Sequence, residues 1–317
     1  MNNQITQQAE VTDDVSGMRL DQAAARLFPD FSRARLQSWI TSGSLRVNGE
    51  TRRNRDKVFA GDLLNVEAEL SAEDEWTAEP MALQIVYEDA SVLVLNKQAG
   101  AVVHPAAGHR AGTLLNGLLH HCPQLELVPR AGIVHRLDKD TTGLMVVAKT
   151  LQAHTSLVKQ LQARKVSREY QAVVNGLLTA GGTIDQPLGR HPVQRKKQAV
   201  IKDGKEAVTH YSVIQRFRAH TQVRVRLETG RTHQIRVHFA YLHYPLVGDR
   251  VYGGRLRIPA GCSEALSEML RGFPRQALHA GKLGFLHPER AELVSWEVDL
   301  PGDMQNLLAI LAEDALE

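Results

Sequence analysis

The densest group of residues able to do chemistry is a short charged run between two apolar segments, "GIVHRLDKDTTGLMVVAKT". It places His135, Arg136, Asp138 and Asp140 within six positions, and turn residues follow at 141–143. Turn side chains can fix such a loop by bonding to its backbone. Charged groups at a sheet edge, between buried strands, are typical of catalytic sites. We therefore predict a catalytic loop with one strand leading in and another leading out.

Two carboxylates compete for the central role in this loop. Asp138 or Asp140 could act as a nucleophile, as a base or as an ion-pair partner, and residue types alone leave the choice open. A polar turn in which the aspartates only cap backbone amides is the simpler alternative. An ionised carboxylate in a catalytic role should lie against a cation. Arg136, Lys139 or an arginine from another segment could supply it.

A second basic cluster is "ETGRTHQIRVHFAYLHYPLVGD". Thr232 can cap a helix with an apolar face at Ile235, Phe239 and Leu242. Arg231 would then lie at a helix N-terminus, where backbone amides also favour an anion. It could bind phosphate or hold a carboxylate, although a surface arginine on a turn is the plainer interpretation.

A third element is the strand "SREYQAVVNG", in which Arg168 and Tyr170 are two positions apart and share a face. A tyrosine on a central strand is usually part of the core. It can also stack on a nucleobase or move a proton.

Several familiar devices are missing from the sequence. It contains no phosphate-binding loop of the nucleotide-triphosphatase kind, no dinucleotide glycine fingerprint and no nucleophile elbow. His120, His121 and Cys122 are adjacent, and His233 and His238 are five apart. Neither spacing predicts a metal site.

The charge distribution favours a polyanionic partner. Residues 81–290 contain 29 Lys/Arg and 14 Asp/Glu, whereas residues 291–317 contain seven acidic residues and no basic one. Such a concentrated positive field suits nucleic acid. Two cysteines, Cys122 and Cys262, indicate reduced thiols and a cytoplasmic protein. No apolar run is long enough to span a membrane, and residues 1–10 have no apolar signal core.

The length of 317 residues suggests two domains. Residues 1–16 are predicted to be a loose polar tail. Residues 17–66 predict two short helices, separated at Pro29 and with Ser32 as a cap. A strand at 44–47, a tight turn at Asn48-Gly49 and a return strand at 58–66 complete this part. Its basic residues include Arg33 and Arg35, which suit phosphate contacts.

The remainder of the chain predicts a different architecture. Residues 67–80 contain six acidic residues and no basic one, which indicates a linker. Beyond residue 83, strands outnumber helices and do not alternate with them regularly. We therefore predict an α+β fold with a mixed, largely antiparallel sheet, and an acidic C-terminal helix through Leu307, Leu308 and Leu311.

Two resemblances sharpen these expectations. "MRLDQAAARLFPDFSRARLQSWITSGSLRVNGE" resembles the S4 RNA-binding domain, which implies an S4-like domain at 17–75 and a linker at 76–82. The segments "NKQAGAVVHP", "GIVHRLDKDTTGLMVVAKT", "SREYQAVVNG", "LETGRTHQIRVHFAYLHYPLVGD" and "RQALHAGKLGFLHP" resemble, in order and spacing, the RluA family of RNA pseudouridine synthases. This implies a catalytic domain with the pseudouridine synthase fold at 83–317.

The second resemblance also implies roles for single residues. Asp138, directly after Arg136-Leu137, matches the family nucleophile. Tyr170 matches the tyrosine that contacts the flipped base and is proposed to move the proton. Arg231 matches the arginine that pairs with the catalytic carboxylate. Arg136 matches a residue that fills the space left by the extruded nucleotide. His135 and Arg168, together with Arg33 and Arg35 of the S4-like part, complete the expected RNA-binding set.

The implied reaction is the isomerisation of uridine to pseudouridine, which needs no cofactor because it involves no redox change and no phosphoryl transfer. The implied partner is large-subunit ribosomal RNA, 23S RNA at helix 69, either free or in an assembling particle. The enzyme is expected to act as a monomer, away from membranes. Two alternatives predict different products: a non-catalytic RNA-binding assembly factor makes none, and a base-removing glycosylase releases free uracil.

Overall fold

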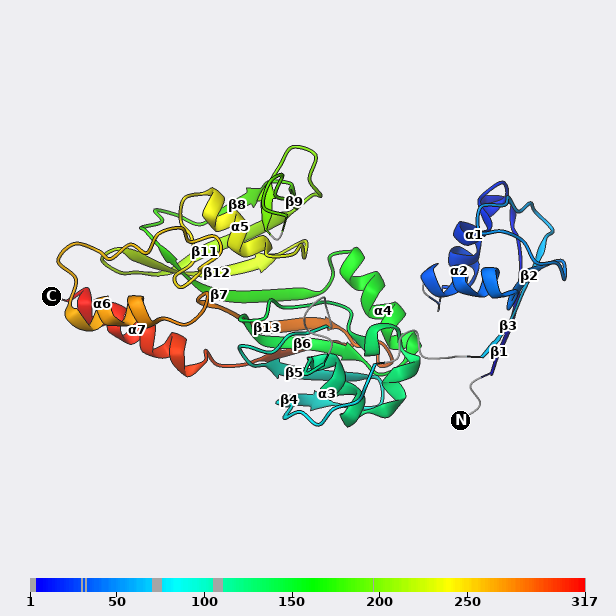
Figure 1. Cartoon of the computed structure of the whole chain (residues 1–317), viewed down its shortest axis with the longest axis horizontal. Helices are drawn as coiled ribbons and strands as arrows, with labels where there is room; N and C mark the ends of the chain where they lie inside the picture. The colour runs from blue at the N-terminus through cyan, green and yellow to red at the C-terminus, as the bar shows by residue number, and fades with distance from the viewer. Residues whose placement is uncertain are drawn as a thin grey trace.

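The computed structural model describes residues 4–29, 31, 33–69, 76–104, 111–195 and 197–316. Figure 1 shows two parts, which we call the N-terminal region (residues 4–69) and the main region (residues 76–316). The expected helix cap at Ser32 lies outside the described residues.

The N-terminal region packs two helices against a small antiparallel sheet, with its strands in the order β1-β3-β2. Its elements are β1 (Gln4–Glu10), α1 (Leu20–Leu27), α2 (Arg33–Ser42), β2 (Leu45–Val47) and β3 (Leu63–Glu69). Leu20, Leu36, Ile40 and Leu64 are completely buried in its core. The predicted helices are confirmed, and the region has one continuous core of its own.

The prediction of a loose tail at residues 1–16 is wrong for residues 4–10. These residues form β1, which pairs with β3 along its whole length, from Gln4 opposite Glu69 to Glu10 opposite Leu63. Most β1 side chains face solvent, so its composition is polar although all seven of its residues pair with β3. Val11 and Val15 then enter the core at 1% exposure.

The tight turn at Asn48-Gly49 is confirmed. Both residues have positive φ values, 52° and 79°, and the N–H of Glu50 donates to the carbonyl of Val47 at 2.9 Å. Asparagine and glycine tolerate this left-handed conformation best. The return strand begins at Leu63 rather than at residue 58, because residues 54–58 first hydrogen-bond to residues 17–21, at the start of α1.

Within the described residues of the main region, nine strands form one sheet in the order β4-β5-β6-β13-β7-β12-β11-β8, and β14 pairs with β13. All neighbours are antiparallel except β6 and β13. This confirms the predicted mixed, largely antiparallel sheet. The strands are β4 (Ile85–Glu88), β5 (Val92–Lys97), β6 (Thr142–Ala148), β7 (Ser167–Asn175), β8 (Gly182–Asp185), β11 (Val208–Arg216), β12 (His220–Leu227), β13 (Leu278–Leu286) and β14 (Leu293–Glu297). A separate hairpin joins β9 (Leu188–Arg190) to β10 (Gln198–Val200).

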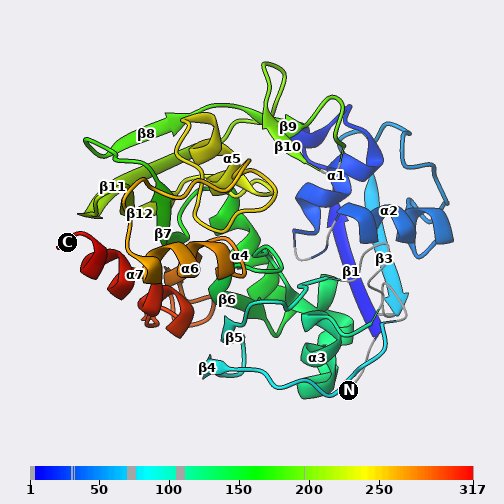
Figure 2. The same ribbon diagram turned by 60° about the vertical axis from the view of Figure 1, so that its left-hand side comes forward.

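Helices cover both faces of this sheet (Figures 1 and 2). The helix α3 (Leu114–His121) and the helix α5 (Gln234–Tyr241) contribute to the core on one face. On the other face lie α4 (Leu151–Gln162), α6 (Glu264–Gly272) and α7 (Gly302–Asp314). α7 buries Leu307 and Leu311, as the C-terminal pattern predicts. None of the helices in the described ranges has the length and apolarity needed to cross a bilayer.

The strand predicted to lead into the charged loop is absent. Residues 129–132 form a 3₁₀ turn instead, in which Arg130 and Ala131 have φ values of 54° and 49°. Gly132 passes so close to β6 that an added Cβ would lie 1.9 Å from the carbonyl oxygen of Ala148. The apolar run is therefore buried as an irregular segment, with a single bridge from Ile133 to Val147.

The two regions meet beside α4, where Leu151 packs against the N-terminal core. Arg35 is 5% exposed, and its Nη1 donates to the carbonyl of Leu127 at 3.3 Å. The expectation that Arg35 binds RNA is therefore wrong in this arrangement, because its guanidinium joins the two regions. Arg33 is half-exposed and its Nη2 lies 2.6 Å from the buried carboxylate of Asp21.

Candidate active site

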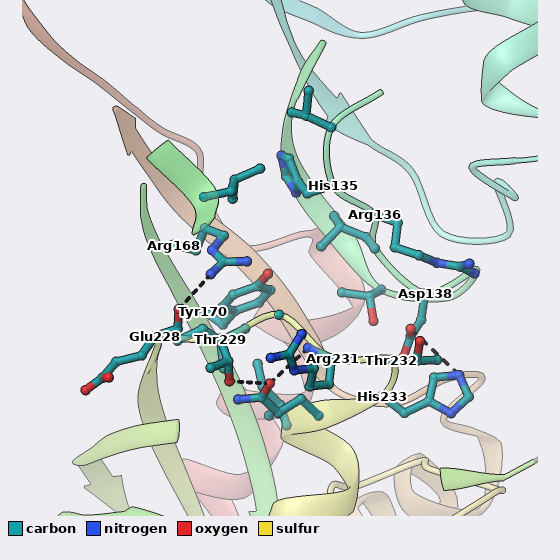
Figure 3. A pocket seen from close by; sticks show the side chains of 18 of the residues that line it. His135, Arg136, Asp138, Arg168, Tyr170, Glu228, Thr229, Arg231, Thr232 and His233 are labelled. Carbon is teal, nitrogen blue, oxygen red and sulfur yellow. Dashed lines mark hydrogen bonds and ion pairs between the residues drawn. The ribbon is translucent and has the colours of Figure 1, made fainter. Parts of the chain in front are cut away.

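An open cleft of about 800 Å³ lies over the face of the sheet that α3 and α5 cover, between the charged loop and the start of α5, as Figure 3 shows. Most of its lining comes from the loop before β6, the end of α4, strand β7, and the segment from the end of β12 to the first turn of α5. His104 and Leu278 of β13 also line it. It contains six of the sequence-predicted residues: His135, Arg136, Asp138, Arg168, Tyr170 and Arg231. Arg33 and Arg35 belong to the N-terminal region.

Asp138 lines this cleft and its side chain is 16% exposed. Its Oδ2 accepts a hydrogen bond from Nη1 of Arg236 at 2.9 Å. Its Oδ1 lies 3.8 Å from Nε2 of His233. Asp140 does not line the cleft, and its carbonyl accepts a hydrogen bond from Arg275 behind the loop. The geometry thus favours Asp138 over Asp140 as the group that can meet a substrate.

Arg236 holds two carboxylates at once. Its Nε and Nη2 bind Asp249 at 2.7 and 2.9 Å, which leaves Nη1 for Asp138. Although burial lowers it, these two carboxylates together raise the pKa of Arg236 above its ordinary value. Asp249 is itself fixed by the N–H groups of Val251 and Tyr252. Arg236 is therefore a rigid, permanently charged anchor for Asp138.

The prediction that Arg231 pairs with Asp138 is wrong, because Arg236 takes that place. The Nε of Arg231 donates to the carbonyl of Glu206 at 2.9 Å. The helix also begins later than predicted: the N-cap is His233, with φ of 57°, rather than Thr232. Arg236 therefore lies in the first turn of α5 and reaches back to the loop. A charged residue between Ile235 and Val237 was the one sequence signal that could have indicated it.

Tyr170 and Arg168 share a face of β7, as the two-residue spacing predicts. Tyr170 is 6% exposed, and burial raises the pKa of its hydroxyl. Arg168 is 7% exposed, and its Nη2 donates to the carbonyl of Glu228 at 3.4 Å. Gly230 makes room for it, since a Cβ there would lie 2.5 Å from Nη1 of Arg168.

His135 and Arg136 differ in exposure although they are neighbours. Arg136 is exposed along the cleft. His135 accepts a hydrogen bond at Nε2 from the N–H of Val146, at 3.1 Å. Burial lowers the pKa of His135 to about 3, so the ring stays neutral and able to accept. His135 thereby ties the loop to β6, a structural contact that its predicted RNA-binding role did not include.

Two buried cations that sequence reasoning missed hold the loop from behind. Lys97, 1% exposed, donates to the carbonyls of Lys139, Gln98 and Ala101 at 2.7, 2.9 and 2.9 Å. Burial lowers the pKa of Lys97 to about 8.

Arg275, 4% exposed, donates from Nη1 to the carbonyl of Asp140 at 3.2 Å, and its Nε and Nη2 bind Asp303 of α7 at 2.7 and 2.8 Å. The backbone carbonyls of Lys139 and Asp140 are thus both held by charge-assisted hydrogen bonds.

Comparisons with known proteins identify the family of this chain. Residues 91–241, which include the Asp138 loop, Tyr170 and Arg236, match the RNA pseudouridylate synthase family. The chain is 60% identical to ribosomal large subunit pseudouridine synthase D of Pseudomonas aeruginosa, over 99% of this chain and 98% of that protein. Proteins of the same name from Vibrio parahaemolyticus and Yersinia pestis are 54% and 51% identical, each over 100% of this chain and 98% of theirs.

A solved structure, human RNA pseudouridylate synthase domain containing 1, matches with a TM-score of 0.56 at 26% identity, over 74% of this chain and 91% of that one. A second human structure, RNA pseudouridylate synthase domain containing 4, shares the fold with a TM-score of 0.56 at 23% identity, over 72% and 92%. The chain belongs to the RluA family of RNA pseudouridine synthases. It is an isomerase that converts uridine in RNA to pseudouridine.

Proposed function

We propose that this enzyme converts uridines in helix 69 of 23S ribosomal RNA to pseudouridine, and that Asp138 starts the reaction. The observation that carries the catalytic assignment is the anchored carboxylate: Asp138 faces the cleft while its Oδ2 is held by the buried Arg236. The names of the full-length relatives support the ribosomal large subunit as the source of the RNA. The assignment to helix 69 of that RNA rests on the sequence resemblance.

The isomerisation demands that the uracil–ribose bond break and that the base return through carbon 5. A carboxylate can start this by attacking the anomeric carbon or by removing a ribose proton, and either route needs an ionised, oriented group. Arg236 supplies the compensating charge and fixes the rotation of the carboxylate. Because Arg236 is also bound to Asp249, it does not follow Asp138 if that side chain moves.

The cleft also has to hold a base taken out of its helix. Flipping a nucleotide costs a few kcal/mol, and phosphate contacts by Arg136 and other exposed arginines of the cleft can offset this. The ring of Tyr170 forms an apolar floor on which the flipped uracil stacks. Its raised pKa keeps the hydroxyl protonated near neutral pH, which favours the stacking role over proton removal.

Asp138→Asn tests the catalytic assignment. The amide keeps the size of the side chain and can still pack against Arg236, but it can neither attack nor accept a proton. Release of tritium from uridine labelled at carbon 5 should be abolished, while RNA binding persists. Turnover near wild type would refute the assignment. Asp140→Asn is the matched control, since that side chain does not line the cleft, and it should retain most activity.

The substrate and the product need separate experiments. Mapping of pseudouridines in ribosomal RNA from cells lacking the gene should show their loss in helix 69 of 23S RNA, with restoration by wild type and not by Asp138→Asn. Loss at other positions would refute the assignment to helix 69 and leave the reaction class unchanged. RNA mass should stay constant in vitro, whereas free uracil would indicate a glycosylase. Binding without any product would indicate an assembly factor.

A further inference from the structure

His233 lies between the proposed catalytic carboxylate and a tyrosine that no part of the reaction described above uses. Its Nε2 is 3.8 Å from Oδ1 of Asp138, and its Nδ1 is 2.7 Å from the hydroxyl of Tyr252. Figure 3 shows the ring beside Asp138, on the side opposite Tyr170. The two carboxylate oxygens of Asp138 therefore face two different groups: Oδ2 faces Arg236 and Oδ1 faces His233.

The hydrogen bonds around Tyr252 favour one tautomer of His233. The N–H of Gln198 in β10 donates to the hydroxyl of Tyr252 at 2.9 Å. That hydroxyl has one proton of its own to donate, and Nδ1 of His233 is the acceptor in reach. A neutral ring that accepts at Nδ1 carries its proton on Nε2. The donor therefore points toward Oδ1 of Asp138.

Burial favours the neutral form of the ring. Burial lowers the pKa of His233, and Arg236 and Arg136 act in the same direction, whereas Asp138 and Asp249 oppose them. Tyr252 faces the ring edge-on, with centroids 5.6 Å apart, and the guanidinium of Arg236 lies 5.1 Å from the Tyr252 ring centre. A second proton on His233 would leave Nδ1 unable to accept from Tyr252 and would place a cation beside Arg236.

The backbone holds the ring in this place at an energetic cost. His233 has φ of 57°, in the left-handed region that costs a residue with a Cβ of order 1–2 kcal/mol. This conformation turns the chain immediately before Gln234, the first residue of α5. A histidine that only capped the helix would not need this geometry, and its side chain makes no capping hydrogen bond.

We propose that His233 is a positioning residue for Asp138, and that Tyr252 sets its tautomer. Its Nε2–H holds Oδ1 while Arg236 holds Oδ2, so the carboxylate is fixed against rotation when the ribose arrives. The 3.8 Å separation closes to a hydrogen bond when RNA fills the cleft, as catalytic contacts often tighten in the substrate complex. This inference rests on the proposed role of Asp138.

Tyr252→Phe is the sharpest test, because it removes one oxygen and keeps the ring beside Arg236. Without the hydroxyl, Nδ1 loses the donor that favours the neutral ring, and the pKa of His233 rises. We expect kcat to fall about 5-fold with KM unchanged, and the acidic limb of the kcat–pH profile to move to higher pH. Tyr241→Phe is the matched control, since Tyr241 is exposed at the other end of α5. It should change neither quantity.

His233→Asn is the second test, because asparagine tolerates a positive φ better than most residues. It should lower kcat about 10-fold and remove the acidic limb that Tyr252→Phe displaces. Thermal unfolding and RNA binding are measured alongside.

A purely structural role would lower the melting temperature or raise KM and leave the limb in place, which would overturn the inference. So would an unchanged kcat and pH profile in Tyr252→Phe. If Asp138→Asn is inactive in the same assays, either outcome refutes only the role of His233. If Asp138→Asn is active, the proposed function fails first.

Discussion

Two sets of arginines, one in each region, differ in burial and in what they can do. In the main region, Arg236 and Arg275 are buried, at 5% and 4% exposure, and each joins a carboxylate to the loop that carries Asp138. In the N-terminal region, Arg46, Arg52, Arg53 and Arg55 are exposed. Buried guanidinium groups fix geometry, because breaking their ion pairs leaves an unpaired charge in the interior. Exposed ones act through a field that salt can screen. From this difference we propose that the buried set supports catalysis and that the exposed set of the N-terminal region adds to RNA attraction.

The largest effect is expected from Arg236→Lys. Lysine keeps the charge, but it cannot bind Asp249 through two nitrogens and Asp138 through a third. Losing a buried charged contact costs about 2–5 kcal/mol, so kcat should fall roughly 100-fold. Arg231→Lys is the matched control, since its side chain binds the carbonyl of Glu206. Single-turnover rates measure both, and a larger loss in Arg231→Lys would restore the pairing that the sequence suggested.

A smaller effect is expected from Asp303, which binds Arg275 behind the loop. Asp303→Asn weakens the pair with Arg275, whose Nη1 supports the carbonyl of Asp140. We expect kcat to fall about 5-fold, because hydrogen bonds to charged groups contribute about 1.5–3 kcal/mol and only part of this reaches the loop.

Asp314→Asn is the control on the same helix. Asp314 is 2% exposed and binds Arg218 and the N–H of Ser263, far from the loop in sequence and contacts. It should lower the melting temperature more than Asp303→Asn does, and kcat less. If Asp314→Asn lowered both the melting temperature and kcat more than Asp303→Asn did, α7 would matter only for stability.

Some residues of the site could be predicted from the sequence and others could not. Residue types and spacing left Asp138 and Asp140 as equal candidates, and Asp138 and Tyr170 were singled out because the motifs around them match those of the family. Arg236 was missed because its pairing with Asp138 spans 98 positions and depends on where α5 begins. Lys97 and Arg275 were missed because they bind backbone carbonyls, which leave no trace in the sequence of the loop they support. Strand β1 was missed because a half-exposed edge strand can be polar throughout.

RNA attraction by the N-terminal region is tested by replacing Arg52, Arg53 and Arg55 with glutamine together. These side chains lie on an exposed surface of the N-terminal region. If each contacts one phosphate, the slope of log affinity against log salt should become shallower by between about 2 and 3. At moderate salt, KM should rise while kcat under saturating RNA stays unchanged. Arg271→Gln, on the exposed side of α6, is the control and should leave the slope unaltered. A fall in kcat would mean that the region also shapes the site.

The last expectation concerns stability in acid, which should separate the two regions. Residues 1–69 contain no histidine, whereas the main region buries several. Burial lowers the pKa of His220, 1% exposed, to about 4, compared with about 6.5 in an unfolded chain. Between these values the unfolded chain binds a proton that the folded chain does not. The main region should therefore lose stability as the pH falls from about 6.5 to 4, by up to about 3 kcal/mol for this histidine.

The N-terminal region should respond only at lower pH. Although burial raises it, hydrogen bonds from Arg33, Gln37 and Arg19 hold the pKa of Asp21 below its ordinary value. Its contribution is complete above about pH 4 and is lost as the pH falls further. Urea unfolding followed by Trp39, with Trp76 and Trp296 replaced by phenylalanine, reports on this region alone. His220→Gln should flatten the response of the main region. If both regions lost stability together between about pH 6.5 and 4, the junction at Arg35 would couple them into one folding unit.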